Sequence, residues 1–124
     1  MYQFFEILPG DGPARMYRPA QAIALQIVVA LLGTSRIVVT GTDRFGLLLW
    51  IDADALADGR EPNPRASAVA RAVFRSQAAA VCGPLVITGG SAEEPAALGP
   101  DEADEAYSYL FALESAGAAD GGRP

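Results

Sequence analysis

The chain has 124 residues, with nine basic side chains, fifteen acidic ones, no histidine and one cysteine, which gives a formal charge of −6 and a pI of about 4.4. This length suits one domain, and the lack of histidine excludes Ser–His–Asp and Cys–His catalytic sites and most zinc sites. All the basic residues are arginine, so lysine-dependent phosphate loops and Schiff bases are excluded as well.

The first predicted strand covers residues 3–8, an aromatic and β-branched run that ends at Pro9-Gly10. A helix is predicted from Pro19 to Leu32, because proline suits a first helical turn and Gly33 suits a C-terminal stop. Its residues are apolar all round, which is typical of a helix buried on most sides or covered by a partner. A central core helix is the main interpretation, a homodimer interface the second, and a strand over its C-terminal end the third.

Two antiparallel strands are predicted next, over residues 36–42 and 45–52, with turn residues between them. The run from Leu47 to Ile51 is apolar without alternation. Such a strand is expected inside the sheet, covered on both faces.

The pair Asn63-Pro64 indicates a helix start, an N-cap followed by proline at the first helical position. That helix is predicted to extend through Ala80, and a fourth strand follows over residues 85–88. Residues 91–99 are rich in Ala, Glu and Pro and predict a linker, and Pro100 opens a helix with an acidic first turn.

These elements divide the chain into an α+β domain (residues 1–90), a linker with an acidic helix packed on or beside it (91–115) and a disordered tail (116–124). The order strand-helix-strand-strand-helix-strand-helix predicts a small α+β fold. We expect a mixed, mostly antiparallel four-stranded sheet with two or three helices, mainly on one face.

The charge is divided unevenly along the chain. Residues 1–90 carry a net charge of +1, whereas residues 91–124 carry −7. The acidic helix could dock a basic partner or mimic a phosphate backbone, or it could be a solvated helix lying against an arginine face. The candidate partner-binding residues are Arg71, Arg75, Asp101, Glu102, Asp104 and Glu105.

The segment most similar to a binding site is Asn63-Pro64-Arg65-Ala66-Ser67. If Asn63 caps the helix, free N–H groups beside Arg65 and Ser67 could receive a phosphate or carboxylate. The alternative is a capped helix with an exposed arginine.

Three other features carry weaker signals. Gly89-Gly90-Ser91 resembles the start of a phosphate loop, but the acids that follow would repel phosphate. Asp52 and Asp54 could be paired carboxylates or metal ligands, but two acids without other oxygen ligands specify no site, and strand-end solvation is the favoured explanation. Cys82 has no evident activating base and is expected to be a small buried side chain. No cofactor and no metal are expected.

The stretch from Trp50 to Ser67, followed by CGPLVITGG, resembles an uncharacterised family catalogued as domain of unknown function 3846. The matching positions are Trp50, Gly59, Asn63, Arg65, Ala66, Ser67, Gly83 and Gly89. The resemblance covers roughly residues 45–90, with Ser67 in place of the usual threonine. It implies a small accessory protein of phages and bacteria, often actinobacteria, with no established activity.

The N-terminus lacks a basic segment before an apolar one, and the most apolar run is too short to span a bilayer. We therefore expect a cytoplasmic, non-enzymatic accessory protein that binds a protein partner or small anionic ligand, with no membrane or direct nucleic-acid contact. A homodimer through the helix Pro19–Leu32 is a further expectation. The alternatives are an acidic inhibitor of a nucleic-acid-binding protein and an enzyme that uses Asp52, Asp54 or Arg65.

Overall fold

The computed structural model describes residues 3–10, 14–17, 24–41, 47–55, 57, 59–74, 81–106 and 108. In chain order the elements are β1 (Phe4–Ile7), β2 (Arg15–Tyr17), α1 (Leu25–Leu32), β3 (Ile37–Gly41), β4 (Leu48–Asp52), α2 (Pro64–Phe74), β5 (Leu85–Gly90) and β6 (Pro95–Ala96). Residues 100–106 form a further helix. The predicted α+β class is confirmed.

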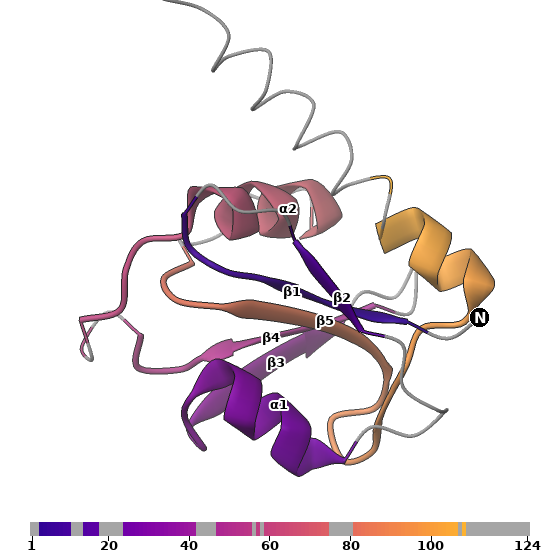
Figure 1. Cartoon of the computed structure of the whole chain (residues 1–124), viewed down its shortest axis with the longest axis horizontal. Coiled ribbons are helices and arrows are strands. Elements are labelled where there is room, and N and C mark those ends of the chain that lie inside the picture. The colour runs from indigo at the N-terminus through magenta and orange to yellow at the C-terminus, as the bar shows by residue number, and fades with distance from the viewer. Residues whose placement is uncertain are drawn as a thin grey trace, which may run out of the picture.

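The strands form one sheet in the order β2-β1-β5-β4-β3, with β6 pairing to β5 (Figure 1). All strand pairs in the described part of the chain are antiparallel. The predicted hairpin of β3 and β4 and the inner position of β4 are both confirmed. The prediction of four strands was too low, because β2 and β6 are three and two residues long. Strands this short carry almost no alternating pattern.

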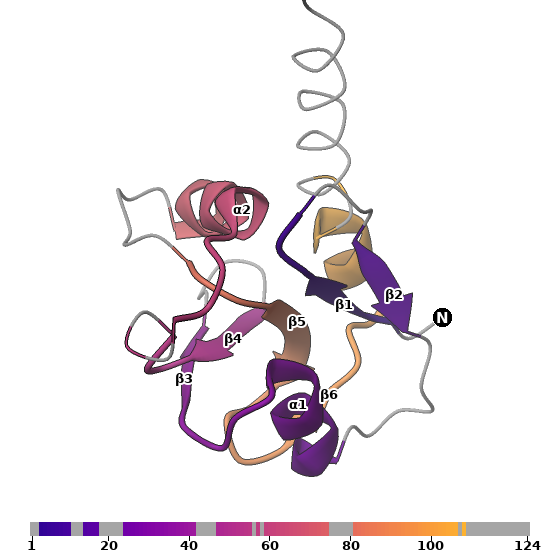
Figure 2. The same cartoon turned by 60° about the vertical axis from the view of Figure 1, so that its left-hand side comes forward.

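The sheet is covered on both faces rather than mainly on one, which corrects the expected arrangement (Figure 2). Helix α1 lies on one face, and α2 and the helix of residues 100–106 lie on the other. Because side chains alternate along a strand, the inner strands β1, β4 and β5 each contribute to two separate cores. The core on the α1 side contains Phe4, Val28, Leu32, Trp50, Val86 and Ala97.

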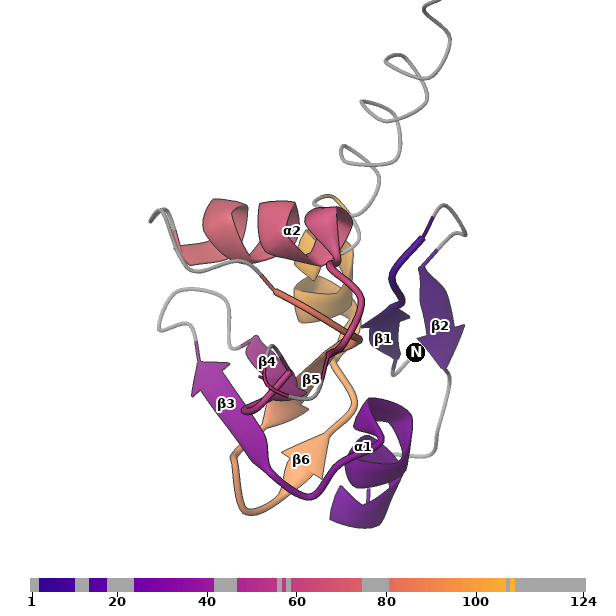
Figure 3. The ribbon, with the colours of Figure 1, turned by 90° about the vertical axis from the view of Figure 1, so that its left-hand side faces the viewer.

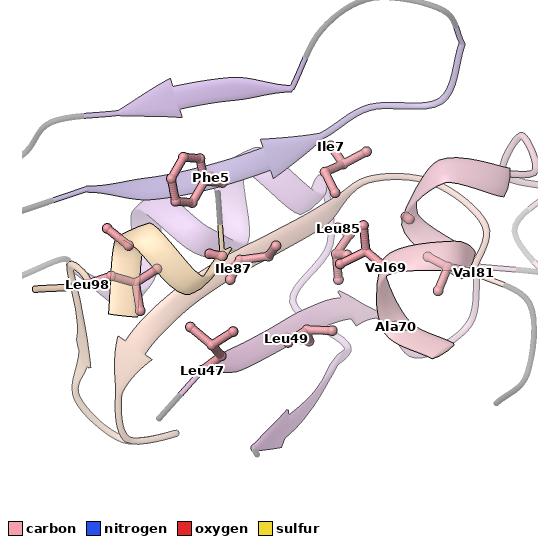
Figure 4. Close-up of a cluster of buried hydrophobic side chains, with 13 residues drawn as sticks. Phe5, Ile7, Leu47, Leu49, Val69, Ala70, Val81, Leu85, Ile87 and Leu98 are labelled. Atoms are coloured by element: carbon pink, nitrogen blue, oxygen red, sulfur yellow. The ribbon is translucent and has the colours of Figure 1, made fainter. Parts of the chain in front are cut away.

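The larger core lies on the α2 side (Figure 4). It contains Phe5, Ile7, Leu47, Leu49, Ala66, Val69, Ala70, Val81, Leu85, Ile87, Leu98, Ala103 and Ala106. Ala103 and Ala106 place the helix of residues 100–106 directly on the sheet. Their small side chains allow its backbone to approach the strands closely.

Helix α1 differs from its prediction at its start and in its surroundings. Ala24 is extended (φ −66°, ψ 136°), so the helix begins at Leu25 and does not run unbroken from Pro19. Gly33 ends it in the left-handed conformation (φ 73°), as predicted. The interpretation of this segment as a central core helix is wrong, because Leu25 and Ile27 are 40% and 44% exposed.

The segment predicted as a linker also differs from expectation. It contributes β6, and Leu98 is 1% exposed in the larger core. Leu98 exchanges two backbone hydrogen bonds with Gln3, of 2.6 and 3.0 Å. At Gly90 (φ 80°) a Cβ would collide with the Glu94 carbonyl oxygen, so the tight return into β6 requires glycine.

Other predicted features have mixed outcomes. Strand β5 extends to Gly90, two residues beyond the prediction. The predicted turn at residues 42–46, the predicted continuation of the second helix over residues 75–80 and the predicted tail (116–124) lie outside the described residues. Among the residues that the structure describes, no helix has the length and apolar character needed to cross a membrane.

Two leucines of α1 provide a matched test of its packing. Leu32 is fully buried, so Leu32→Ala is expected to lower the free energy of unfolding by about 2–5 kcal/mol. Leu25 is in the first turn of the same helix and is 40% exposed, so Leu25→Ala should cost much less, about 1 kcal/mol or less. Urea unfolding of both variants measures the difference, and equal losses would contradict the difference in burial between the two leucines.

Candidate functional site

Asn63 lies where the end of β1, the start of α2 and the turn before β5 meet. It is 1% exposed. Its side-chain Nδ2 donates hydrogen bonds to the carbonyl oxygens of Ile7 (3.0 Å) and Gly83 (2.8 Å). Its Oδ1 accepts one from the backbone N–H of Ala66 at 3.1 Å, which confirms the predicted N-cap. One side chain therefore joins three segments of the fold.

Ser67 reinforces the same junction from the next helical turn. It is 5% exposed, and its Oγ donates to the Asn63 carbonyl oxygen at 2.9 Å. The same Oγ accepts a hydrogen bond from the backbone N–H of Val81 at 2.7 Å. The Asn63 N–H donates to the Val81 carbonyl oxygen at 2.9 Å, so the segment before β5 is held from both sides.

Arg65 is half-buried and reaches back to the end of β1. Its Nη2 donates to the carbonyl oxygen of Leu8 at 3.0 Å. Its Nε is buried and has no hydrogen-bond partner, the one such side-chain atom among the residues that the structure describes. A buried unpaired donor costs about 1–3 kcal/mol, so this arginine is not held in an optimal environment.

The helix terminus therefore has few donors left for an anion. Pro64 has no N–H, and the N–H groups of Ala66 and Ser67 already bond to Asn63. The structure does bring Asn63, Arg65 and Ser67 together, as the sequence predicted. It gives the anion hypothesis no support beyond the Arg65 guanidinium.

Asp52 and Asp54 form a second polar cluster at the end of β4. The Asp52 side chain is fully buried, and its Oδ2 accepts a hydrogen bond from Arg60 Nε at 3.1 Å. Arg60 Nη2 also donates to the Gly33 carbonyl oxygen at 3.1 Å, which ties the end of α1 to β4. Asp54 instead pairs with the exposed Arg36 at 2.8 Å. The two carboxylates thus have separate arginine partners and structural roles.

A buried carboxylate that the sequence analysis missed lies on β1. Glu6 is 2% exposed and accepts a hydrogen bond from the Tyr17 hydroxyl at 2.8 Å. Arg15 Nη1 is 4.0 Å from the same carboxylate oxygen, and the ring of Tyr17 stacks on Phe4 with a centroid distance of 4.8 Å. In the sequence, the only indication of this buried carboxylate is that Glu6 is the single acid in the largely apolar run of residues 3–8.

The environment of Tyr17 favours its neutral form. Burial raises the pKa of the phenol above its usual value, and the hydrogen bond to Glu6 raises it further. The hydroxyl is therefore a stable donor to Glu6, and it anchors the short edge strand β2 to β1.

The structure describes all of the charged residues predicted to bind a partner except Arg75. Arg71 is exposed on α2, and Arg75 lies outside the described residues. On the helix of residues 100–106, Asp101, Glu102 and Asp104 are exposed and Glu105 is half-buried.

The two remaining sequence features lie in ordinary structural positions. Cys82 is half-buried, in a β-bridge with Pro62. Gly89-Gly90-Ser91 runs into the β5–β6 turn, where the Ser91 N–H donates to the Glu94 carbonyl oxygen at 3.1 Å. The resemblance to a phosphate loop therefore reflects a β-turn.

No protein-family model, curated protein or solved structure matches the chain. What the protein does is therefore inferred from its own residues. The described part of the chain also has no group of three or more His, Cys, Asp or Glu side chains that could hold a metal ion.

The raised pKa of Tyr17 predicts a pH-dependent stability. Below a pH of about 10 the phenol is protonated in both states, so its contribution to stability is complete. As the pH rises further, the unfolded chain ionises first, and the contribution is lost as the pH passes through the higher folded-state pKa. At pH 8 the free energy of unfolding of Tyr17→Phe should be lower than that of the native chain, and this difference should be smaller at pH 11. Urea unfolding at the two pH values measures the difference. A difference that does not change with pH would contradict a raised pKa of Tyr17.

Proposed function

We propose that this protein is a small, non-enzymatic accessory protein that binds a protein partner through the exposed residues of α1. The observation that carries the proposal is the combination of exposure and composition on this helix. Leu25 and Ile27 are 40% and 44% exposed, and Gln26 and Ala30 are exposed beside them. No Asp, Glu, Lys or Arg occurs between Arg18 and Arg36.

A solvated helix normally presents charged side chains on its outer side. This one presents isoleucine, alanine and glutamine, with Leu25 exposed at its first turn, a composition suited to contact with another protein. Covering the exposed parts of Leu25 and Ile27 would contribute on the order of 1 kcal/mol each. The inner side of the same helix is already anchored by Val28 and Leu32, so its outer side is held in place for binding.

The polar side chains support a binding role rather than catalysis. Asn63, Ser67 and Asp52 are the groups with the most suggestive chemistry, and each is bonded to protein atoms that hold the fold together. A group engaged in this way is poorly placed to act on a substrate, because the reaction would have to break a structural contact.

We extend the proposal to the cellular compartment and the family of the protein. We place it in the cytoplasm and group residues 45–90 with domain of unknown function 3846. The residues that carry this resemblance include Trp50, Asn63, Arg65 and Ser67, and each bonds internally. A resemblance carried by such residues supports a common fold more than a common chemistry. If the partner is a second copy of the chain, the result is the homodimer expected through the helix Pro19–Leu32.

An acidic inhibitor of a nucleic-acid-binding protein is the second candidate. The exposure of Asp101, Glu102 and Asp104 on one short helix favours it. Binding of this kind would weaken steeply with salt, whereas apolar contact through α1 would not.

The exposed residues of α1 can be tested with two variants of equal exposure. Leu25 and Met16 are both 40% exposed, but Met16 lies on β2, opposite Phe5 on the α2 side of the sheet. Leu25→Glu should abolish the capture of a specific partner from a bacterial lysate, because a carboxylate would be buried at the contact. Met16→Glu should leave it unchanged. Affinity capture with quantitative mass spectrometry measures both.

Three outcomes would count against the proposal. Equal capture by the native chain and Leu25→Glu would exclude the α1 contact. An equal loss of captured partner in Leu25→Glu and Met16→Glu would show a general effect of added charge. Release of the captured protein by moderate salt would instead support the acidic inhibitor.

A further inference from the structure

Strand β3 is the last strand of the sheet on one side, and its outer edge is unpaired in the described part of the chain (Figure 3). The Ala53 N–H donates to the Arg36 carbonyl oxygen at 2.8 Å. This bond identifies Arg36 and Ala53 as a hydrogen-bonded pair, and such pairs alternate along an antiparallel ladder. Val38 and Thr40 therefore bond towards β4, and Ile37, Val39 and Gly41 direct their N–H and C=O groups outwards.

This edge lacks the features that normally prevent strand addition. Edge strands are usually protected by lysine, proline, a bulge or an inward-pointing charge. Residues Ile37–Gly41 contain no proline and no charged residue, and they pair with β4 in continuous register. Val38 is 44% exposed, on the face opposite α1. The other edge strand, β2, is shorter and carries Arg15.

We propose that β3 of a second copy of this chain pairs antiparallel with this edge, on a two-fold axis at Val38, so that one sheet continues through a dimer. In this register Val38 faces Val38 of the second copy at a non-hydrogen-bonded position. Ile37 and Val39 of each copy exchange backbone hydrogen bonds with Val39 and Ile37 of the other. The groups that β3 directs outwards are the ones that this register uses.

Charge and shape favour a second copy as the occupant. The pairing places Arg36 opposite Thr40 of the other copy, so no like charges face each other. The Arg36 guanidinium is already paired with Asp54 at 2.8 Å, so two chains of net charge −6 meet along an edge that is locally neutral. The contact also brings the exposed valines together, and β-branched pairs are favourable across strands.

This inference does not depend on the proposed function. Helix α1 lies on a face of the sheet, whereas the pairing uses its edge, so both outer helix sides stay open in the dimer. The dimer would then present two copies of the α1 surface to a partner.

A cysteine at the two-fold axis tests the register directly. Cβ atoms at a non-hydrogen-bonded pair are about 4.5–5.5 Å apart, close enough for a disulfide after a small adjustment. In a Cys82→Ser background, Val38→Cys should form a disulfide-linked dimer under mild oxidation. Met16→Cys, which is 40% exposed on the other edge strand, is the matched control and should cross-link at least about tenfold more slowly.

Sedimentation of the native chain and of Val38→Arg completes the test. The native chain should be a dimer, and Val38→Arg should be a monomer, because two guanidinium groups would face each other. A monomeric native chain, or equal cross-linking of the two cysteine variants, would overturn the inference. A dimer that Leu25→Glu dissolves and Val38→Arg does not would also overturn it, while supporting association through α1.

Discussion

The side-chain amide of Asn63 connects three parts of the chain that are distant in sequence. Its hydrogen bonds to Ile7 and Gly83 fix the end of β1 beside the start of β5, and its bond to the Ala66 N–H begins α2 at the same point. The larger core depends on this junction, because α2 contributes Ala66, Val69 and Ala70 to it. A buried amide with satisfied donors and acceptor specifies one arrangement of these segments, since any other would leave polar groups unpaired.

The remaining polar contacts also join secondary-structure elements, at the edges of the fold. Arg60 links Asp52 on β4 to the end of α1, and Tyr17 links β2 to Glu6 on β1. Interior polar groups are thus used to position secondary structure. What is left for recognition is the outer surface, where α1 is apolar, the edge of β3 is open and the helix of residues 100–106 is acidic. The proposed binding of a partner rests on these outer features.

The sequence predicted the features that depend on local chemistry. The cap at Asn63, the stop at Gly33 and the inner strand β4 each follow from one or two residues and their neighbours. It did not predict β2 and β6, because two or three residues show no period, nor the placement of helices on both faces. The hydrophobicity of α1 predicts burial on most sides, but the sheet covers only one side of this helix. Asn63, Arg65 and Ser67 lie together, as predicted. Their partners Ile7, Leu8, Val81 and Gly83 are set by tertiary contacts that spacing does not reveal.

We expect the Asn63 segment to serve the fold rather than to bind an anion, because its donors already bond within the protein. Asn63 is the only asparagine in the chain, so its side-chain amide gives a distinct NMR signal. Hydrogen exchange of that amide, measured with and without inorganic phosphate, distinguishes the two roles. We predict that its protons exchange far more slowly than those of an exposed amide and that neither they nor the Arg65 N–H shift on adding phosphate. Rapid exchange, or a saturable shift of these signals with phosphate, would contradict it.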